Sequence, residues 1–406
     1  MPTAVPPRTP TAVPAAPGAP APAAPGAAAP AAAAAGAARA HRPPVLAEVA
    51  ARAEVSVATV SRVLNDRGGS AAARRRVGTA LDVLGYERPA HLAERATPPV
   101  PDGVGVPEPV ARGLVGLVLP DLGNPVFPRF AGVVERCLAA AGLTPLLCTL
   151  TPGGVHEDAY VRVLRAHGAA GVVFASGLHA NTEADPARYH ALHADGMPFV
   201  LVNGAVPGLD VPAVAHDDAL GTRQAVRHLR QLGHVRVGLV LGPVRYTPSR
   251  RRAAAFAALV AERELGPEAA GLVAHDEYGA EGGERAAARL LAAGATALVC
   301  ASDLQALGAV RAVRAAGLAV PGDVSVVGSD DSPLLRFTDP PLTTVRQDVE
   351  GVGATAVQAL LDEMRGGRAA PGGGARTEIL LPPELVLRGT TAPPSARSLQ
   401  RLVAAR

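Results

Sequence analysis

The sequence contains no lysine and only three cysteines, and 18% of its residues are charged. Arginine supplies every strong cation, which suits forked contacts to phosphate or guanine, although we favour a genome-wide compositional bias as the reason. The formal net charge of +3 permits nucleic-acid binding without indicating it. Cys137, Cys148 and Cys300 lie in apolar surroundings without metal-ligand spacing. We therefore expect buried free thiols, a reducing compartment, and neither a metal nor a cofactor.

Long apolar runs and an export signal are also missing from the sequence. No apolar run reaches the roughly 18 residues that a membrane helix needs. The N-terminus has no basic start followed by an apolar segment. We expect a cytoplasmic protein with no membrane partner. Apolar residues still make up 48% of the 406 residues, so the chain can form sizeable cores, and its length suggests two or three folding units.

Two stretches have a composition that gives no packed core. Residues 1–42 are almost entirely Ala, Pro, Gly and Thr, which predicts a disordered tail, with a wrongly chosen start codon as the alternative. Residues 97–113 are rich in Pro, Gly and Val, which predicts an extended linker. We place a hinge and linker at 89–112 between two folded parts.

Between these stretches, helical periodicity appears in three short segments, at 46–53, 57–65 and 72–84. Three helices in so few residues predict a compact domain at 43–88. The first two have the spacing of a helix-turn-helix.

Beyond residue 113, buried-strand runs such as LVGLVLP and VSVVGSD alternate with helical stretches in two successive series. The clearest helical stretches fall at 130–141, 157–166, 252–264, 281–293 and 304–316. This alternation predicts two α/β lobes built on doubly wound parallel sheets, with a ligand cleft at the carboxyl ends of the strands.

The second helical segment has the chemistry of a DNA reader. Ser56 stands where this helix needs an N-cap. Arg62 can bond both acceptors of a guanine, and Val57 and Ala58 can touch a thymine methyl group. The side chains suited to phosphate oxygens are Ser56, Thr59, Ser61 and Asn65. The alternative is the solvated face of a small protein-binding bundle.

The string VAARAEVSVATVSRVLN at 49–65, with GY at 85–86, closely resembles the DNA-binding head of the lactose/galactose repressor (LacI) family. The resemblance implies a transcriptional regulator, associated with the nucleoid, in which Val57, Ala58 and Arg62 hold base-reading positions. Val45 stands where the family caps its first helix with Thr or Ser, and Glu54 where its turn has Gly or Asn. These departures predict a less stable head.

The hinge departs further from the family. The family inserts a Leu into the minor groove, whereas this chain has Ala96 there and Glu94 in place of an Arg near phosphates. The sequence therefore does not predict kinking of DNA by an inserted side chain. A degenerate head that acts through protein partners stays an alternative.

The same resemblance continues through 113–391. Its motifs are PDLGNPVF at 120–127, AHDDALG at 215–221, HLRQLGH at 228–234, ASDLQALGA at 301–309, VPGDVSVVGSDD at 320–331, PPLTTVRQD at 340–348 and LPPELVLRGTT at 381–391.

These motifs imply a sensor of the periplasmic-binding-protein type, which also carries the dimer contacts. Its lobes would be 113–216 plus 345–375, and 217–344 plus a C-terminal strand. The tail at 392–406 has too few leucines for a tetramer-forming bundle, so we expect a homodimer on a pseudopalindromic operator.

A cleft for a polyhydroxylated effector needs charged or amide groups and an aromatic face. The resemblance places Asn124, Phe127, Asn203, Arg252, Tyr278, Ser302, Asp303, Asp330 and Gln347 in such a cleft. Arg252 would clamp the ligand, Tyr278 would stack on it and Asp330 would accept its donors. Asn124 and Asp303 have helix capping as an alternative role. Asn203 stands where some relatives have a ligand-contacting Asp.

Two other classes of function compete with a regulator. The string Gly351, Gly353, Ala356 has the spacing of a dinucleotide-binding motif but should lie within a helix. His216, Asp217 and Asp218 could suggest metal or acid/base chemistry, but their order matches the family's strand-to-helix turn, in which an Asp caps the helix. We therefore expect no enzyme activity. A solute-binding transport protein would need an export signal. We predict a repressor controlled by a sugar or sugar derivative, with a nucleobase or nucleoside as the alternative effector. In the family, the ligand more commonly relieves repression, and in some members it acts as a corepressor.

Overall fold

The computed structural model describes residues 46–64, 68–84, 113–151, 154–366 and 378–396. The predicted tail at 1–42, the hinge and linker with Glu94 and Ala96, and the positions Val45, Asn65, Gly85 and Tyr86 lie outside these residues. None of the helices formed by the described residues is long and apolar enough to cross a membrane.

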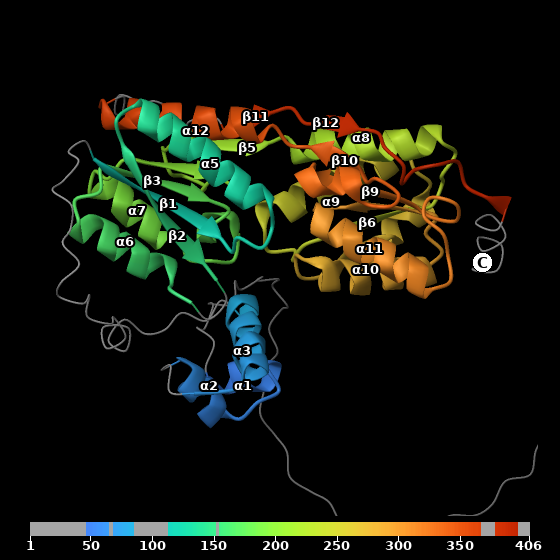
Figure 1. The fold of residues 1–406 in the computed structure, drawn as a ribbon, viewed down its shortest axis with the longest axis horizontal. Helices are drawn as coiled ribbons and strands as arrows, with labels where there is room; N and C mark the ends of the chain where they lie inside the picture. Colours follow the sequence, from blue (N-terminus) through green and yellow to red (C-terminus); the bar gives the residue numbers. More distant parts are fainter. Residues whose placement is uncertain (1–45, 65–67, 85–112, 152–153, 367–377, 397–406) are drawn as a thin grey trace, which may run out of the picture. The chain divides into compact units, whose positions relative to one another are not determined.

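The head contains α1 (Leu46–Arg52), α2 (Val57–Leu64) and α3 (Ala71–Leu84), close to the three predicted segments (Figure 1). Val49, Val60 and Val77 are completely buried and join the helices into one core. Ser56 caps α2 as predicted, because its Oγ accepts a hydrogen bond from the amide of Thr59 at 3.1 Å. Glu54 takes a positive φ of 52° in the turn, where glycine or asparagine would be less strained.

The first lobe is built on a parallel sheet in the order β11-β5-β4-β3-β1-β2. Its strands are β1 (Leu114–Pro120), β2 (Thr144–Leu150), β3 (Gly171–Ala175), β4 (Phe199–Val202), β5 (Ala213–His216) and β11 (Ile379–Leu381). One face packs against α5 (Val126–Ala140) and α12 (Val349–Met364), and the other against α6 (Glu157–Ala166) and α7 (Ala187–Ala194).

The second lobe repeats this design in the order β12-β10-β9-β8-β6-β7, with only β12 antiparallel to its neighbour among the described strands. Its strands are β6 (Val237–Leu241), β7 (Val273–His275), β8 (Ala297–Cys300), β9 (Ser325–Asp330), β10 (Thr343–Arg346) and β12 (Glu384–Val386). One face packs against α8 (Asp218–Gln231) and α9 (Thr247–Ala261), and the other against α10 (Ala280–Ala292) and α11 (Asp303–Ala315). The predicted fold class is confirmed.

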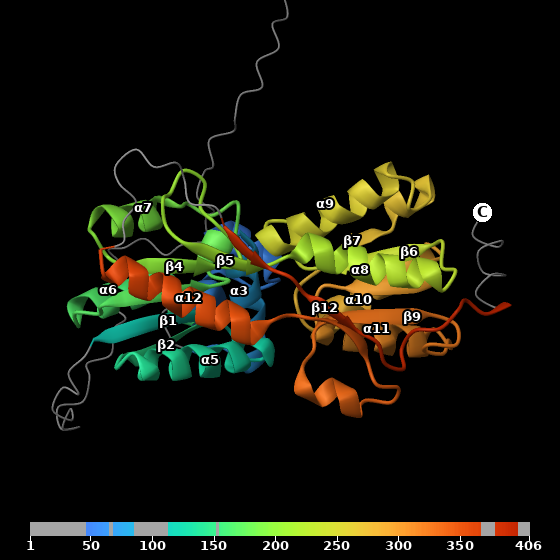
Figure 2. The same ribbon diagram turned by 90° about the horizontal axis from the view of Figure 1, so that it is seen from above.

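The described chain crosses between the lobes three times. The crossings lie at Asp217 between β5 and α8, at 347–348 between β10 and α12, and at 382–383 between β11 and β12 (Figure 2). The second crossing comes later than the predicted residue 345, because Thr343–Arg346 pairs with β9 and belongs to the second lobe. Residues 392–396 also depart from the prediction of a tail: the amide of Ala392 donates to Ser325 Oγ at 3.0 Å.

Two smaller predictions concern side chains away from the cleft. Gly351, Gly353 and Ala356 lie inside α12, as predicted from the sequence. Cys148 and Cys300 are buried free thiols and Cys137 is a half-buried one. Burial raises the pKa of Cys148 to about 11 and also raises that of Cys300.

Candidate functional site

A cavity of about 490 Å³ lies between the carboxyl ends of the two sheets. Of the predicted effector residues, those that line it are Asn124, Phe127, Asn203, Arg252, Tyr278, Ser302, Asp330 and Gln347. They come from segments up to 223 residues apart in the chain, from Asn124 to Gln347. The two sheets therefore bring them together because strands of both lobes end at this cleft.

Asp330 at the end of β9 is the centre of a hydrogen-bond group. Its Oδ2 accepts from Asn124 Nδ2 at 3.3 Å, and its Oδ1 accepts from Gln347 Nε2 at 2.8 Å. Burial, followed by the nearby charge of Asp303, raises the pKa of Asp330 well above its usual range. Asn124 Oδ1 also accepts from the amide of Val126, the first residue of α5, at 3.2 Å, although Pro125 holds the N-cap position of this helix. Asn124 thus lines the cleft and bonds to the start of α5, but it is not the N-cap residue of that helix.

Arg252 on α9 lines the cleft, is buried, and is paired with a carboxylate. Its Nε donates to Asp218 Oδ1 at 2.9 Å, and its Nη1 donates to the carbonyl of Ala301. Burial raises the pKa of Asp218, and the guanidinium of Arg252 opposes that rise. The positive charge at the cleft wall is therefore already balanced by a carboxylate.

Tyr278 is fixed at its hydroxyl end and open on its ring. A Cβ atom on Gly242 would lie only 2.1 Å from the ring, so the ring rests directly on the backbone there. The Tyr278 hydroxyl lies 2.9 Å from Ser249 Oγ, and burial raises its pKa to about 12. The side chain keeps 45% of its surface exposed, which leaves a flat apolar face toward the cleft.

Asp303 is the one predicted effector residue that does not line the cavity. Its carboxylate is buried, and it accepts from the amide of Ser332 and from Thr344 Oγ1, both at 2.7 Å. The cap of α11 is its neighbour Ser302, whose Oγ accepts from the amide of Gln305 at 3.1 Å. Asp303 therefore anchors the loop that follows Asp330 instead of facing a ligand.

Sequence reasoning missed several lining residues. Tyr246 and His216 belong to the cavity wall, as do Ser176 and Asp121. Burial and the charge of Arg252 lower the pKa of His216 to about 4, so its imidazole is neutral near pH 7. Ser176 accepts a hydrogen bond from Asn203 Nδ2 at 2.9 Å, and both residues have positive φ angles. One signal in the sequence could have identified His216 as a lining residue, namely its position at the end of a buried strand run.

The exposed surface of α2 is the second candidate site. Val57 keeps 46% of its surface exposed, whereas Val60 is completely buried. Ala58 and Arg62 are also exposed, and Arg62 Nε donates to the carbonyl of Ala58 at 3.3 Å. The hydroxyls of Ser56 and Thr59 lie 2.9 Å apart. The predicted base-reading side chains therefore share one solvent-exposed face.

Two family models match the chain: bacterial regulatory proteins of the lacI family at residues 45–89, and the periplasmic binding protein-like domain at residues 226–391. A relative named "Uncharacterized HTH-type transcriptional regulator in aml 5'region", from Streptomyces limosus, is 52% identical over 352 residues. These residues cover 86% of this chain and 95% of the relative.

Solved structures show the same likeness in both parts of the chain. The lac repressor dimer bound to operator and the anti-inducer ONPF is 27% identical, with a TM-score of 0.58, over 86% of this chain and 100% of that one. The complex of the transcriptional regulator CelR with cellobiose is 28% identical, with a TM-score of 0.60, over 86% of this chain and 99% of that one.

Proposed function

Since this chain belongs to the lacI family of bacterial regulatory proteins and is a DNA-binding transcriptional regulator, we propose that it is a dimeric repressor controlled by a neutral sugar in its cleft. The observation that carries this proposal is the group around Asp330. A carboxylate flanked by two amides can take paired hydroxyl groups, and the face of Tyr278 can take the C–H side of a sugar ring. The CelR structure, with cellobiose bound, supports this class of effector.

The charges of the cleft favour a neutral effector. Among the described lining residues, the charged side chains are Asp121, Arg252, Glu281 and Asp330. Arg252 is already paired with Asp218, so the described part of the cavity wall offers no unpaired cation to balance a phosphate or carboxylate group of the ligand. Sugar phosphates and nucleotides therefore fit the cleft less well than uncharged sugars.

The DNA-binding part of the proposal assigns the exposed face of α2 to the major groove. Val57, Ala58 and Arg62 would contact base edges, while Ser56, Thr59, Ser61 and Asn65 would contact phosphates. A homodimer would present two such helices to the half-sites of a pseudopalindrome. Sugar binding would change the angle between the lobes and thereby the spacing of the heads.

The test is selection of bound fragments from random double-stranded DNA by the full-length protein at two salt concentrations. We expect an enriched palindrome that Arg62→Ala no longer selects, while Arg52→Ala, an exposed arginine on α1, keeps the selection. Sugars and nucleosides are then screened for release of the selected DNA. Weak, salt-erased binding without a motif would contradict operator recognition, and release by nucleosides alone would contradict the sugar assignment.

A further inference from the structure

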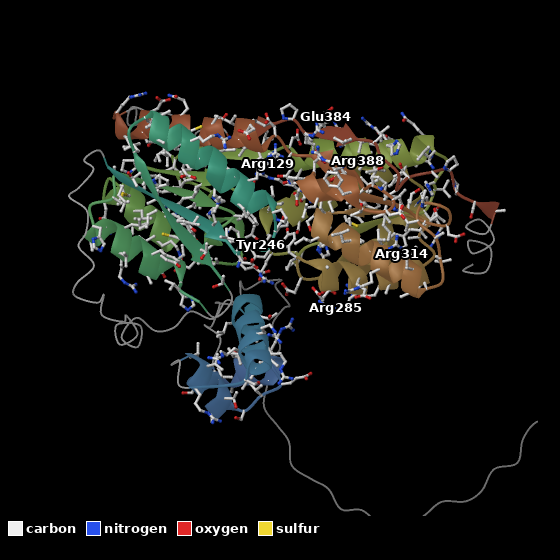
Figure 3. The ribbon with its side chains drawn as sticks, viewed as in Figure 1. Arg129, Tyr246, Arg285, Arg314, Glu384 and Arg388 are labelled. Carbon is white, nitrogen blue, oxygen red and sulfur yellow. The ribbon has the colours of Figure 1, made fainter. Side chains whose placement is uncertain are left out.

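Two tyrosine rings share the cleft. Tyr278 and Tyr246 both line the cavity, with their ring centroids 6.0 Å apart and their planes tilted by 53°. Figure 3 shows Tyr246 at the junction of the two lobes. Tyr246 precedes α9, in the loop that also places Pro248 in the cavity wall. The aromatic surface of the cleft is thus larger than the single predicted stacking residue.

Tyr246 is also held in place by its surroundings. The guanidinium of Arg245 lies 5.0 Å from the centroid of its ring. Its backbone forms an antiparallel bridge with Asn181 of the first lobe, and the next residue, Thr247, donates from Oγ1 to the carbonyl of Ala180 at 3.2 Å. A ring fixed before binding loses little conformational entropy when a ligand stacks on it.

The polar groups of the cleft are not spread evenly over both rings. Arg252 lies near enough to Tyr278 and Asp330 to interact electrostatically with both, and Asp330 holds the amides of Asn124 and Gln347. One sugar ring placed against Tyr278 would satisfy this group. Around Tyr246 the wall continues with the small or apolar residues Ala180 and Pro248. The cavity of about 490 Å³ also falls within the range of about 300–1,000 Å³ that is typical of sites for drug-sized ligands.

We propose that Tyr246 forms a second stacking subsite, so that the effector is a neutral oligosaccharide of at least two linked rings. The first ring lies against Tyr278 and is read through its hydroxyls by the Asp330 group. The second ring lies with its C–H face on Tyr246. This inference rests on the proposed function, because it assumes that a sugar occupies the cleft.

The experiment is isothermal titration calorimetry on the full chain, with glucose and galactose against maltose, cellobiose, lactose and maltotriose. We expect at least one disaccharide to bind about tenfold or more tightly than its monosaccharide. Tyr246→Ala should weaken that disaccharide by about tenfold and the monosaccharide by less than about threefold. Tyr246→Phe should behave like the unchanged protein, because stacking does not need the hydroxyl. Tyr160→Ala, at a tyrosine of α6 outside the cavity, is the matched control.

Three results would contradict the proposal. Equal binding of a monosaccharide and its disaccharide overturns the second subsite and leaves the sugar effector standing. Equal weakening of both by Tyr246→Ala does the same. Binding of none of these sugars overturns the subsite together with the sugar effector. Even if Tyr246→Ala does not fold, the affinities of the unchanged protein for monosaccharides and for longer sugars decide whether a second subsite exists.

Discussion

The amide of Asn124 in the first lobe donates to the carboxylate of Asp330 in the second lobe at 3.3 Å, across the cleft. The two residues are 206 positions apart in the chain. A ligand hydroxyl that binds Asp330 has to share this carboxylate with Asn124 or replace it. The contact between the lobes and the proposed contact with the effector therefore use the same carboxylate group.

Asp330→Asn should raise the stability of the unliganded protein at pH 7. Burial and Asp303 raise the pKa of Asp330, so the folded protein binds this proton more tightly than the unfolded chain. Its contribution to stability is fully present below the unfolded pKa of about 4 and is lost as pH rises through the folded pKa. The variant avoids that loss, as thermal unfolding should show, while calorimetry should show sugar binding weakened by about tenfold or more.

Asp331→Asn is the matched control with the opposite sign. Burial alone would raise the pKa of Asp331, but hydrogen bonds from Arg388 and Arg346 lower it. Its contribution to stability is present above the unfolded pKa and is lost as pH falls through the folded pKa. The variant should lose about 2 kcal/mol at pH 7. If the Asp330→Asn protein were less stable than the unchanged protein at pH 7, the raised pKa of Asp330 in the folded protein would be refuted.

Arg252→Met should destabilise the fold as well as abolish sugar binding. The substitution leaves Asp218, whose side chain is only 7% exposed, without its ion-pair partner. Removing one member of a buried pair costs about 3–5 kcal/mol. The double variant Arg252→Met with Asp218→Leu should regain most of the lost free energy of unfolding, as measured by urea unfolding. Its sugar binding should stay absent. In the control Arg223→Met, the broken pair with Glu262 is more exposed, so the cost should stay below about 1 kcal/mol.

The prediction from sequence succeeded where structure is decided locally. Ser56 caps α2, and the helical segments of the head were placed within two residues, because capping and periodicity are properties of neighbouring residues. The start of α9 was placed five residues late, at Arg252 instead of Thr247, since Pro248 is accepted in the first turn of a helix.

Residues that depend on distant partners could not be placed from the sequence. Asp303 follows a buried strand run, as a ligand contact would, but Thr344 and Ser332 turn its carboxylate away from the cleft. Nothing near Tyr246 in the chain shows that it pairs with Asn181 of the other lobe. Both outcomes follow from contacts made only after the sheets have assembled.

Thr182→Val tests the bridge that holds this junction of the lobes. Thr182 Oγ1 and the Thr182 amide both donate to the carbonyl of Arg245, at 2.9 and 2.8 Å. The variant keeps the hydrogen bond from the Thr182 amide. It loses the hydrogen bond from the hydroxyl to Arg245, worth about 1 kcal/mol, and the longer one that the hydroxyl accepts from exposed Arg250 at 3.3 Å. If the sugar binds the bridged arrangement of the lobes, its affinity should fall roughly fivefold in calorimetry.

Thr338→Val is the control for the Thr182 variant. The Thr338 hydroxyl donates to Leu335 and Pro340 within the second lobe, so its loss should leave sugar affinity unchanged even if stability falls by a similar amount. Equal effects of the two substitutions on affinity would mean that the bridge does not take part in binding.

Three substitutions at Ser56 separate helix capping from phosphate contact. Ser56→Ala removes the cap of α2 and should cost about 1 kcal/mol in a head that has a small core. Ser56→Asn and Ser56→Asp both restore the cap and should restore head stability in thermal unfolding. If Ser56 also lies against a phosphate, Ser56→Asn keeps operator affinity, whereas the negative charge of Ser56→Asp lowers it, most strongly at low salt. Equal operator affinity of the two capped variants across salt concentrations would show that Ser56 acts only as a cap.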